Sequence, residues 1–146
     1  MNVREVYFDE IPDIVAKGKA FEEASRNVKV DVEHTTRTFQ NMVKNGTAVM
    51  LALFDDEGKR LGGLAYIKSP DLYSGELMAI ELYWFVHPGN RGSGKLLLDA
   101  FEESAKKNGC VKAAMIHMVD SFPETLKTLY EKRGYKLIEL HYTKEL

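Results

Sequence analysis

Residues 86–98 read VHPGNRGSGKLLL, and this stretch decides the fold. A β-prone run ends in it, a glycine-containing turn follows, and a helical pattern begins. Such a turn exposes backbone N–H groups at the positive end of a helix dipole, where phosphate oxygens bind. Arg91 and Lys95 add positive charge, so the turn is predicted to bind a phosphate-bearing ligand. The alternative is an ordinary tight turn in which Gly92 and Gly94 serve only for their positive φ angles.

The segments on either side of the turn predict a β-loop-α-β unit. Residues 77–86 are the longest β-like run in the chain. Residues 94–108 have an apolar stripe at helical spacing, and residues 110–118 are the next strand candidate. Strands connected through a helix in this way lie parallel, with a right-handed crossover.

The rest of the chain extends this unit to a mixed α/β (α+β) protein. Further strands are expected at residues 3–8, 47–54, 61–67 and 135–143. Helices are expected from Pro12, from an N-cap at Asp31 to about Gly46, and over residues 123–133. The predicted order is β-α-α-β-β-β-α-β-α-β.

Length and composition restrict the class of protein. With 146 residues the chain is expected to form one domain, residues 1–146. Its 20 Lys+Arg and 22 Asp+Glu give a net charge of -2, which argues against a nucleic-acid partner. The single cysteine, Cys110, excludes a disulfide framework and is interpreted as a buried structural thiol. No His or carboxylate pair has metal-ligand spacing, so no metal is predicted. Neither a signal peptide nor a membrane span is recognisable, which favours a cytoplasmic compartment and no membrane partner.

One phosphate-binding pattern matches the turn only in part. Residues 89–95 follow the P-loop pattern G-x-x-x-x-G-K-[ST] up to its lysine. Leu96 then stands where that pattern requires a hydroxyl group to bind magnesium, and a leucine cannot replace it. A P-loop nucleotide-binding protein is therefore the less favoured alternative.

A second resemblance covers essentially the whole chain. Residues 86–94 resemble the acetyl-CoA loop of the GNAT N-acetyltransferase superfamily, whose core pattern is Q/R-x-x-G-x-G/A. Residues 129–135, LYEKRGY, are similar to the late helix-to-strand signature of the same family, in the right order and at the right spacing. Leu96 departs from the final Gly/Ala position of the first motif. Its side chain either hinders the pyrophosphate or turns into the core. Pro123 stands where the family often has an asparagine, leaving Ser121, Asp120 or backbone groups to hold the pantetheine arm.

The resemblance implies a GNAT-like acyl-CoA N-acyltransferase fold. Its central mixed sheet would have about six to seven strands flanked by about four helices. Acetyl-CoA would be the acyl donor, with no metal, and would lie where strands 77–86 and 110–118 splay apart. The pantetheine-pairing backbone carries over to Phe85 and Val86. The pyrophosphate site carries over to Arg91, Gly92, Ser93, Gly94, Lys95 and Leu96.

Two side chains are candidates for proton transfer. Tyr130, in the late motif, is the candidate general acid, because the pKa of a tyrosine lies close to that of a departing thiol. The alternative is an aromatic ring packed under the sheet. Glu81 is the candidate general base, directly or through a water, because a carboxylate buried in an apolar strand has a raised pKa. The alternatives are a solvated or ion-paired glutamate, with Glu76 as the reserve base.

The acceptor is expected to be an amine. The sequence does not distinguish an amine of a small molecule from one of a protein. No nucleophile elbow is present, so direct attack by a primary amine in a ternary complex is expected. The acceptor site is expected within residues 11–45 and the turn at 69–75, whose acidic residues are interpreted as solvated. His87 is interpreted as a surface turn residue and His117 as a core or face histidine. Family analogy allows a homodimer. The alternative function is a non-catalytic CoA-binding or regulatory module, motivated by Leu96 and Pro123.

Overall fold

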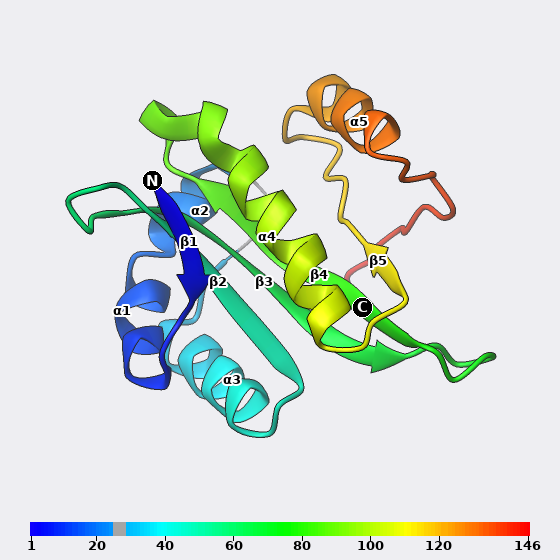
Figure 1. Cartoon of the computed structure of the whole chain (residues 1–146), viewed down its shortest axis with the longest axis horizontal. Coiled ribbons are helices and arrows are strands. Elements are labelled where there is room, and N and C mark those ends of the chain that lie inside the picture. The colour runs from blue at the N-terminus through cyan, green and yellow to red at the C-terminus, as the bar shows by residue number, and fades with distance from the viewer. Residues whose placement is uncertain (25–28) are drawn as a thin grey trace. The chain divides into compact units, whose positions relative to one another are not determined.

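The described strands hydrogen-bond in the order in which they follow one another along the chain (Figure 1). The computed structural model describes residues 1–24 and 29–146, which form two compact units, Met1–Ile116 and His117–Leu146. The sheet lies in the first unit and comprises β1 (Asn2–Glu5), β2 (Ala48–Phe54), β3 (Arg60–Pro70), β4 (Leu77–Val86) and β5 (Lys112–Ala114). Strands β1 to β4 are antiparallel, and β5 lies parallel to β4. This is the predicted mixed sheet, with its parallel pair where the β-loop-α-β unit placed it.

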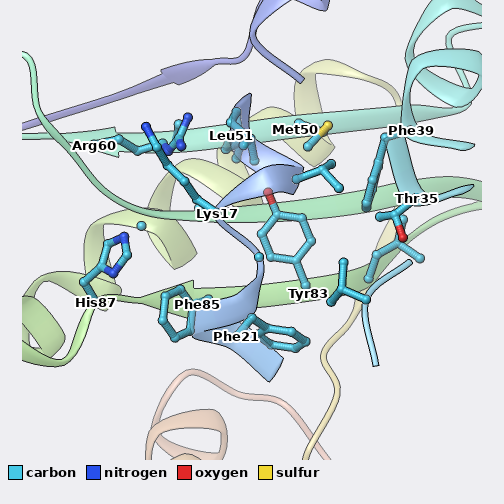
Figure 2. A pocket seen from close by; sticks show the side chains of 18 of the residues that line it. Lys17, Phe21, Thr35, Phe39, Met50, Leu51, Arg60, Tyr83, Phe85 and His87 are labelled. Carbon is cyan, nitrogen blue, oxygen red and sulfur yellow. The ribbon is translucent and has the colours of Figure 1, made fainter. Parts of the chain in front are cut away.

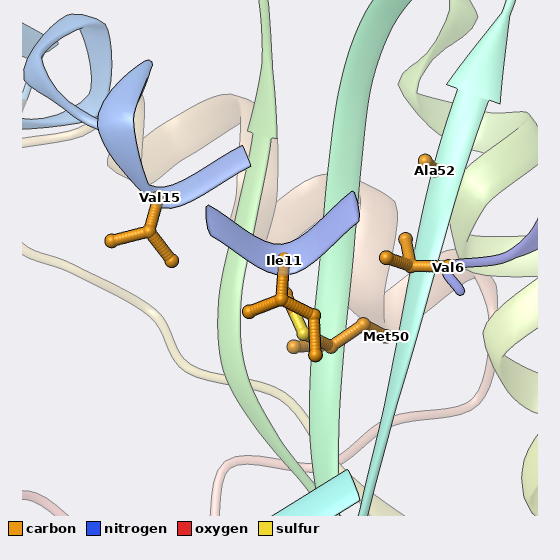
Figure 3. Packing of buried hydrophobic residues seen from close by; sticks show 6 residues of the cluster. Val6, Ile11, Val15, Met50 and Ala52 are labelled. Atoms are coloured by element: carbon orange, nitrogen blue, oxygen red, sulfur yellow. The ribbon is translucent and has the colours of Figure 1, made fainter. Parts of the chain in front are cut away.

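Helices cover both faces of the sheet in the first unit. They are α1 (Ile11–Ala16), α2 (Lys19–Ala24), α3 (Val32–Lys44) and α4 (Gly94–Lys107). Ala65 and Tyr66 are neighbours on β3 and therefore point to opposite faces. The Tyr66 ring contacts Phe101 of α4, with a centroid distance of 5.1 Å. Ala65 belongs instead to a buried cluster with Ile11 and Val15 of α1 (Figure 3). Thus α4 packs on one face and α1 on the other.

The ends of α3 follow the predicted capping residues. Asp31 accepts a hydrogen bond from the backbone N–H of His34 at 2.9 Å, which makes it the N-cap. Gly46 has a φ angle of 70°, and the N–H of Thr47 beyond it donates to the carbonyl of Met42. This bond belongs to the Schellman motif that glycine makes accessible at a helix end. Both boundaries therefore result from local chemistry that the sequence displays.

The predicted first helix is two helices. Gly18 lies between α1 and α2, and its N–H donates to the carbonyl of Val15 at 2.8 Å. A Cβ at this position would lie 2.8 Å from that same carbonyl oxygen, so the tight turn needs glycine. The described chain therefore has five α-helices, the fifth being α5 (Pro123–Lys132), where about four were expected.

The sheet has fewer strands than predicted. Within the described residues it contains five strands instead of about six to seven. β1 ends at Glu5, before the 3-10 turn Phe8–Glu10, and β5 is limited to Lys112–Ala114. β5 is short because Ile116 donates its N–H to the carboxylate of Glu81, at 2.9 Å, in place of a strand carbonyl.

The second unit contains α5, which begins at Pro123 as predicted. The strand expected at residues 135–143 is wrong: these residues form no strand, and Leu137, Ile138 and Tyr142 are largely exposed. An apolar alternation becomes a strand only when a partner strand takes its backbone hydrogen bonds. Across residues 1–24 and 29–146, no helix combines the length and the apolar character needed to cross a membrane.

Candidate functional site

The carboxyl half of β4 has a bulge and a neighbour on one side only. β4 pairs with β5 from Met78 to Ile80, and from Glu81 onward its ladder among the described strands is with β3 alone. Glu81 lies opposite Tyr66 and Tyr83 lies opposite Ala65, so Leu82 is an additional residue between them. The pairing of β4 with β5 therefore ends where strands 77–86 and 110–118 were predicted to splay apart.

The backbone direction at the end of β4 follows from one hydrogen bond. His87 donates its N–H to the carbonyl of Leu61 at 2.9 Å, towards β3. Because peptide groups alternate in direction along a strand, those of Phe85 also face β3 and those of Val86 face the opposite edge. Of the two residues predicted to pair with pantetheine, Val86 thus presents its backbone at that edge.

The glycine-rich turn leads directly into the amino end of α4. Residues Pro88–Ser93 form a 3-10 turn, in which the hydroxyl of Ser93 donates to the carbonyl of Asn90 at 2.6 Å. Ser93 is the N-cap of α4 but makes no side-chain capping bond, and the first turn of the helix contains no acidic residue. Arg91 and Lys95 are exposed. The N–H of Gly94 donates to the carbonyl of Arg91, so an anion at the amino end of α4 would meet the later N–H groups of the first turn together with this positive charge.

The tight-turn explanation of the glycines does not hold. Neither Gly92 nor Gly94 has a positive φ angle. A Cβ at Gly94 would lie 3.2 Å from Cζ2 of Trp84, so this glycine allows α4 to approach β4 closely. A Cβ at Gly92 would meet no described atom within 4 Å. Nothing in the described chain requires glycine at position 92.

Leu96 does not turn into the core. Its neighbours Leu97 and Leu98 are fully buried, whereas Leu96 is 41% exposed. The second of the two predicted orientations is therefore wrong, because the helix directs Leu97 and Leu98 towards the sheet and Leu96 towards solvent. An apolar side chain thus lies on the exposed side of the first turn of α4.

Glu81 is a buried carboxylate at the point where β4 and β5 part. The residue is 6% exposed, and burial raises its pKa to about 7, against the opposing effect of the hydrogen bond from Ile116 N–H. It shares a face with Tyr66, whose hydroxyl is hydrogen-bonded to Ser104 Oγ of α4 at 2.8 Å. Glu76, the reserve candidate, instead forms an exposed ion pair with Lys112 at 3.1 Å. Glu81 therefore has the protonation behaviour of a base near neutral pH, and Glu76 is held in an ion pair.

Tyr130 lies in the second unit, on α5. Its ring contacts those of His117 and Tyr135, with centroid distances of 6.3 and 5.7 Å. The two aromatic residues of the late motif therefore pack together. His117 is not in a strand, contrary to the prediction, because β5 ends at Ala114.

A pocket of about 240 Å³ lies on the opposite face of the sheet from α4 (Figure 2). α1, α2, α3 and strands β2 to β4 contribute to its wall. Its floor is the backbone of Gly62 and Gly63 on β3, and a Cβ at Gly63 would lie 3.1 Å from the Tyr83 hydroxyl. Gly63 therefore makes room for the Tyr83 ring over β3.

The two ends of the pocket differ in chemistry. Lys17, Arg60 and His87 lie at one end, and both cations contact Asp13 Oδ2, at 3.0 and 3.1 Å. At the other end Phe21 and Phe39 contact the Tyr83 ring, and Phe85 contacts Phe21. None of the described residues that line the pocket is acidic.

The hydroxyl of Tyr83 is buried and has no hydrogen-bond partner among the described residues. It lies over Gly63 of β3, since a Cβ at Gly63 would be 3.1 Å from it, and Figure 2 shows it pointing away from Phe21 and Phe85. Burial raises the pKa of Tyr83, while the nearby Arg60 guanidinium acts in the opposite direction. A buried hydroxyl without a hydrogen-bond partner is unfavourable by about 1–3 kcal/mol.

The pocket agrees in part with the expected acceptor region. It contains residues from the range 11–45, of which 25–28 lie outside the described residues, but it contains none from the turn at 69–75. His87 lies in the turn that follows β4, as expected, and is half-buried; its ring lines the pocket, 5.3 Å from that of Phe85. Lys17 and Arg60 were not predicted. They come from separate segments of the chain. The only sequence signal for this region was the glycine pair Gly62–Gly63 in β3, which indicates that another group packs closely against the strand.

Two further predictions concern Cys110 and metal binding. Cys110 is buried, and burial raises the pKa of its thiol, as expected for a structural cysteine. In the part of the chain that the structure describes, no three His, Cys, Asp or Glu side chains gather as metal ligands would.

The sequence pattern described as "Acetyltransferase (GNAT) family" matches residues 18–135. No curated protein matches the chain. A solved structure titled as a probable acetyltransferase has a TM-score of 0.80 at 16% identity, with 100% of this chain and 98% of that chain covered. A ribosomal-protein-alanine N-acetyltransferase from Brucella melitensis biovar Abortus 2308 has a TM-score of 0.74 at 17% identity, with 100% of both chains covered. An aminoglycoside acetyltransferase from an uncultured soil metagenomic sample has a TM-score of 0.77 at 18% identity, covering 99% and 97%. At these identities the solved structures establish the fold.

Proposed function

Because the chain belongs to the GNAT acetyltransferase family, we propose that it transfers the acetyl group of acetyl-CoA to a primary amine, by direct attack in a ternary complex. We propose further that residues 1–146 act together as one acetyltransferase domain in the cytoplasm. The mostly antiparallel sheet is unlike the parallel sheet of the P-loop alternative, which is therefore dropped.

One observation carries the proposal. An uncapped helix start with two exposed cations follows directly on a strand whose outer edge leaves its ladder. A phosphate-bearing ligand with an extended polar arm fits this combination: Arg91 to Leu96 would hold the pyrophosphate, and the backbone of Val86 would pair with the arm. The open space at Gly92 supports close approach of a phosphate to the turn.

The proton transfers are assigned to Glu81 and Tyr130. The amine nitrogen attacks the thioester carbon, a C–N bond forms, and the C–S bond breaks. Glu81 would accept a proton from the amine, and a water would carry it, because Glu81 does not line the pocket on the other face of β4. Tyr130 would give a proton to the departing thiolate.

A titration of the protein with acetyl-CoA tests this function. We expect micromolar binding, weakened about ten-fold or more by Arg91→Ala, since a hydrogen bond to a charged group contributes about 1.5–3 kcal/mol. The matched control is Arg37→Ala, an exposed arginine paired with Glu33 on α3. Mass spectrometry of an amine panel then detects N-acetyl products. Absence of acetyl-CoA binding would refute the proposal, and binding without transfer to any amine would favour the non-catalytic module.

A further inference from the structure

The pocket on the α1 face contains features that the transfer reaction itself does not use. Its basic end has Lys17 and Arg60 sharing one carboxylate, that of Asp13, with His87 beside them. Lys17 and Arg60 exceed the shared carboxylate of Asp13 by one positive charge, and the nearby carboxylate of Glu10 is paired with Arg4. The side chain of Arg60 is only 16% exposed, and among the described residues its guanidinium makes one hydrogen bond, to Asp13. A guanidinium has five N–H donors, so most of them remain for a ligand.

The rest of the pocket requires an apolar partner of limited size. Phe21, Phe39 and Phe85 form edge-to-face contacts around or beside the Tyr83 ring, with centroid distances of 5.9 to 6.4 Å. The volume of about 240 Å³ is below the roughly 300–1,000 Å³ of sites for drug-sized ligands. This space suits a single small molecule better than a folded protein segment.

We propose that the pocket binds the acceptor, and that the acceptor is a small apolar amine that also carries a carboxylate, such as an aromatic amino acid. The inference rests on the proposed transfer function. The carboxylate lies against Arg60 and Lys17, because a guanidinium fork matches the two oxygens of a carboxylate. The apolar body lies among the aromatic rings of Phe21, Phe39 and Tyr83.

Charge selects this acceptor over a simple amine. An amine arrives at neutral pH as an ammonium ion, and the basic end of the pocket repels it. A carboxylate on the same molecule offsets that repulsion and orients the molecule, with its anionic group at the basic end. The acidic residues that a purely cationic acceptor would need are absent from the described lining.

The test uses probes that differ only in the anionic group. Phenylalanine and phenethylamine share the aromatic body and the amine, and the phosphonate analogue of phenylalanine replaces the carboxylate. Binding to the protein without coenzyme is measured by calorimetry, and acetylation is measured separately with acetyl-CoA. We expect phenylalanine to bind at least ten-fold more tightly than phenethylamine. We expect the same preference in kcat/KM, and Arg60→Gln to abolish both preferences.

Matched variants separate recognition from folding. Lys17→Gln, at a largely exposed side chain, should reduce the preference without affecting the thermal unfolding midpoint, and Arg37→Gln should leave it unchanged. Equal or tighter binding of phenethylamine, or no binding of phenylalanine, would overturn the proposal, and a phosphonate that binds more tightly than phenylalanine would overturn its carboxylate part. If the protein acetylates only neutral amines, the transfer function holds and the acceptor proposal fails. If it binds phenylalanine but not acetyl-CoA, the transfer function fails.

Discussion

Glu81 and Tyr83 are separated by one residue on β4, yet their side chains lie on opposite faces of the sheet. In a regular strand they would share a face. The bulge at Leu82 changes this: Glu81 lies opposite Tyr66, on the α4 face, and Tyr83 lies opposite Ala65, on the α1 face. β4 thus places the carboxylate of Glu81 on one face of the sheet and the ring of Tyr83, which lines the pocket, on the other.

The first prediction concerns the pH dependence of the reaction. Glu81 accepts a proton only in its ionised form, and its pKa is raised to about 7. Turnover should therefore rise with pH through about 7. Glu81→Gln should remove this limb and reduce kcat by roughly 10²- to 10⁴-fold. The control Glu76→Gln, at an exposed ion pair, should keep the limb, and an unshifted profile in Glu81→Gln would exclude Glu81 as the base.

The second prediction concerns the stability of the fold. The pKa of Glu81 is about 7 in the folded chain, above the ordinary glutamate value of 4.5, so the folded state holds the proton more tightly. Its contribution to stability is complete below about pH 4.5 and is lost as the pH rises through about 7. Glu81→Gln should therefore gain stability relative to the native chain across this window, by up to about 3 kcal/mol. Urea unfolding of both proteins from pH 4.5 to 8 measures this difference in unfolding free energy. A difference that stays constant over this pH range would contradict the prediction.

The third prediction compares two glycines. A Cβ at Gly62 would lie 2.5 Å from the carbonyl oxygen of Phe85, so Gly62→Ala should lower the free energy of unfolding by about 1–3 kcal/mol. A Cβ at Gly92 meets nothing within 4 Å, so Gly92→Ala should leave stability unchanged or raise it by up to about 1 kcal/mol. The same Gly92→Ala should weaken acetyl-CoA binding by calorimetry, since the added methyl group occupies the space proposed for phosphate. Full affinity in this variant would show that the turn does not contact the coenzyme.

The fourth prediction concerns the leaving group. Tyr130→Phe removes the hydroxyl that is proposed to protonate the thiolate, while the ring remains between His117 and Tyr135. We expect kcat to fall by roughly 10²-fold or more, with nearly unchanged affinity for acetyl-CoA. Tyr135→Phe, at the neighbouring ring, is the control and should keep its turnover. A Tyr130→Phe enzyme with native kcat would remove Tyr130 from the mechanism.

The sequence predicted most reliably the features that depend on local chemistry. Asp31 and Gly46 bound α3 because a side-chain cap and a left-handed residue act within one helical turn. β4 has the predicted bounds, 77–86, because a long apolar run is a strong signal. The burial of Glu81 was also accessible, because a carboxylate in such a run contrasts with its neighbours. Its role as a base stays a prediction.

Features that depend on distant partners were predicted poorly. The alternation at residues 135–143 resembles a strand, but no described strand pairs with it. The basic end of the pocket joins residues from the α1–α2 link, the start of β3 and the end of β4. The Lys17–Asp13 pair has the local i, i+4 spacing of a helix, but no local pattern connects either residue with Arg60, which reaches Asp13 only because α1 packs on the sheet.

The proposed pairing of acetyl-CoA with the β4 edge beyond Ile80 would link the lifetime of the protein to this ligand. A strand edge that no other described strand covers is a template on which another chain can add, and so a starting point for aggregation. A ligand bound along it would protect it and would stabilise the folded state by about 2.7 kcal/mol at a concentration 100 times its Kd. The amount of intact protein would then rise and fall with the supply of acetyl-CoA, before any acceptor is bound.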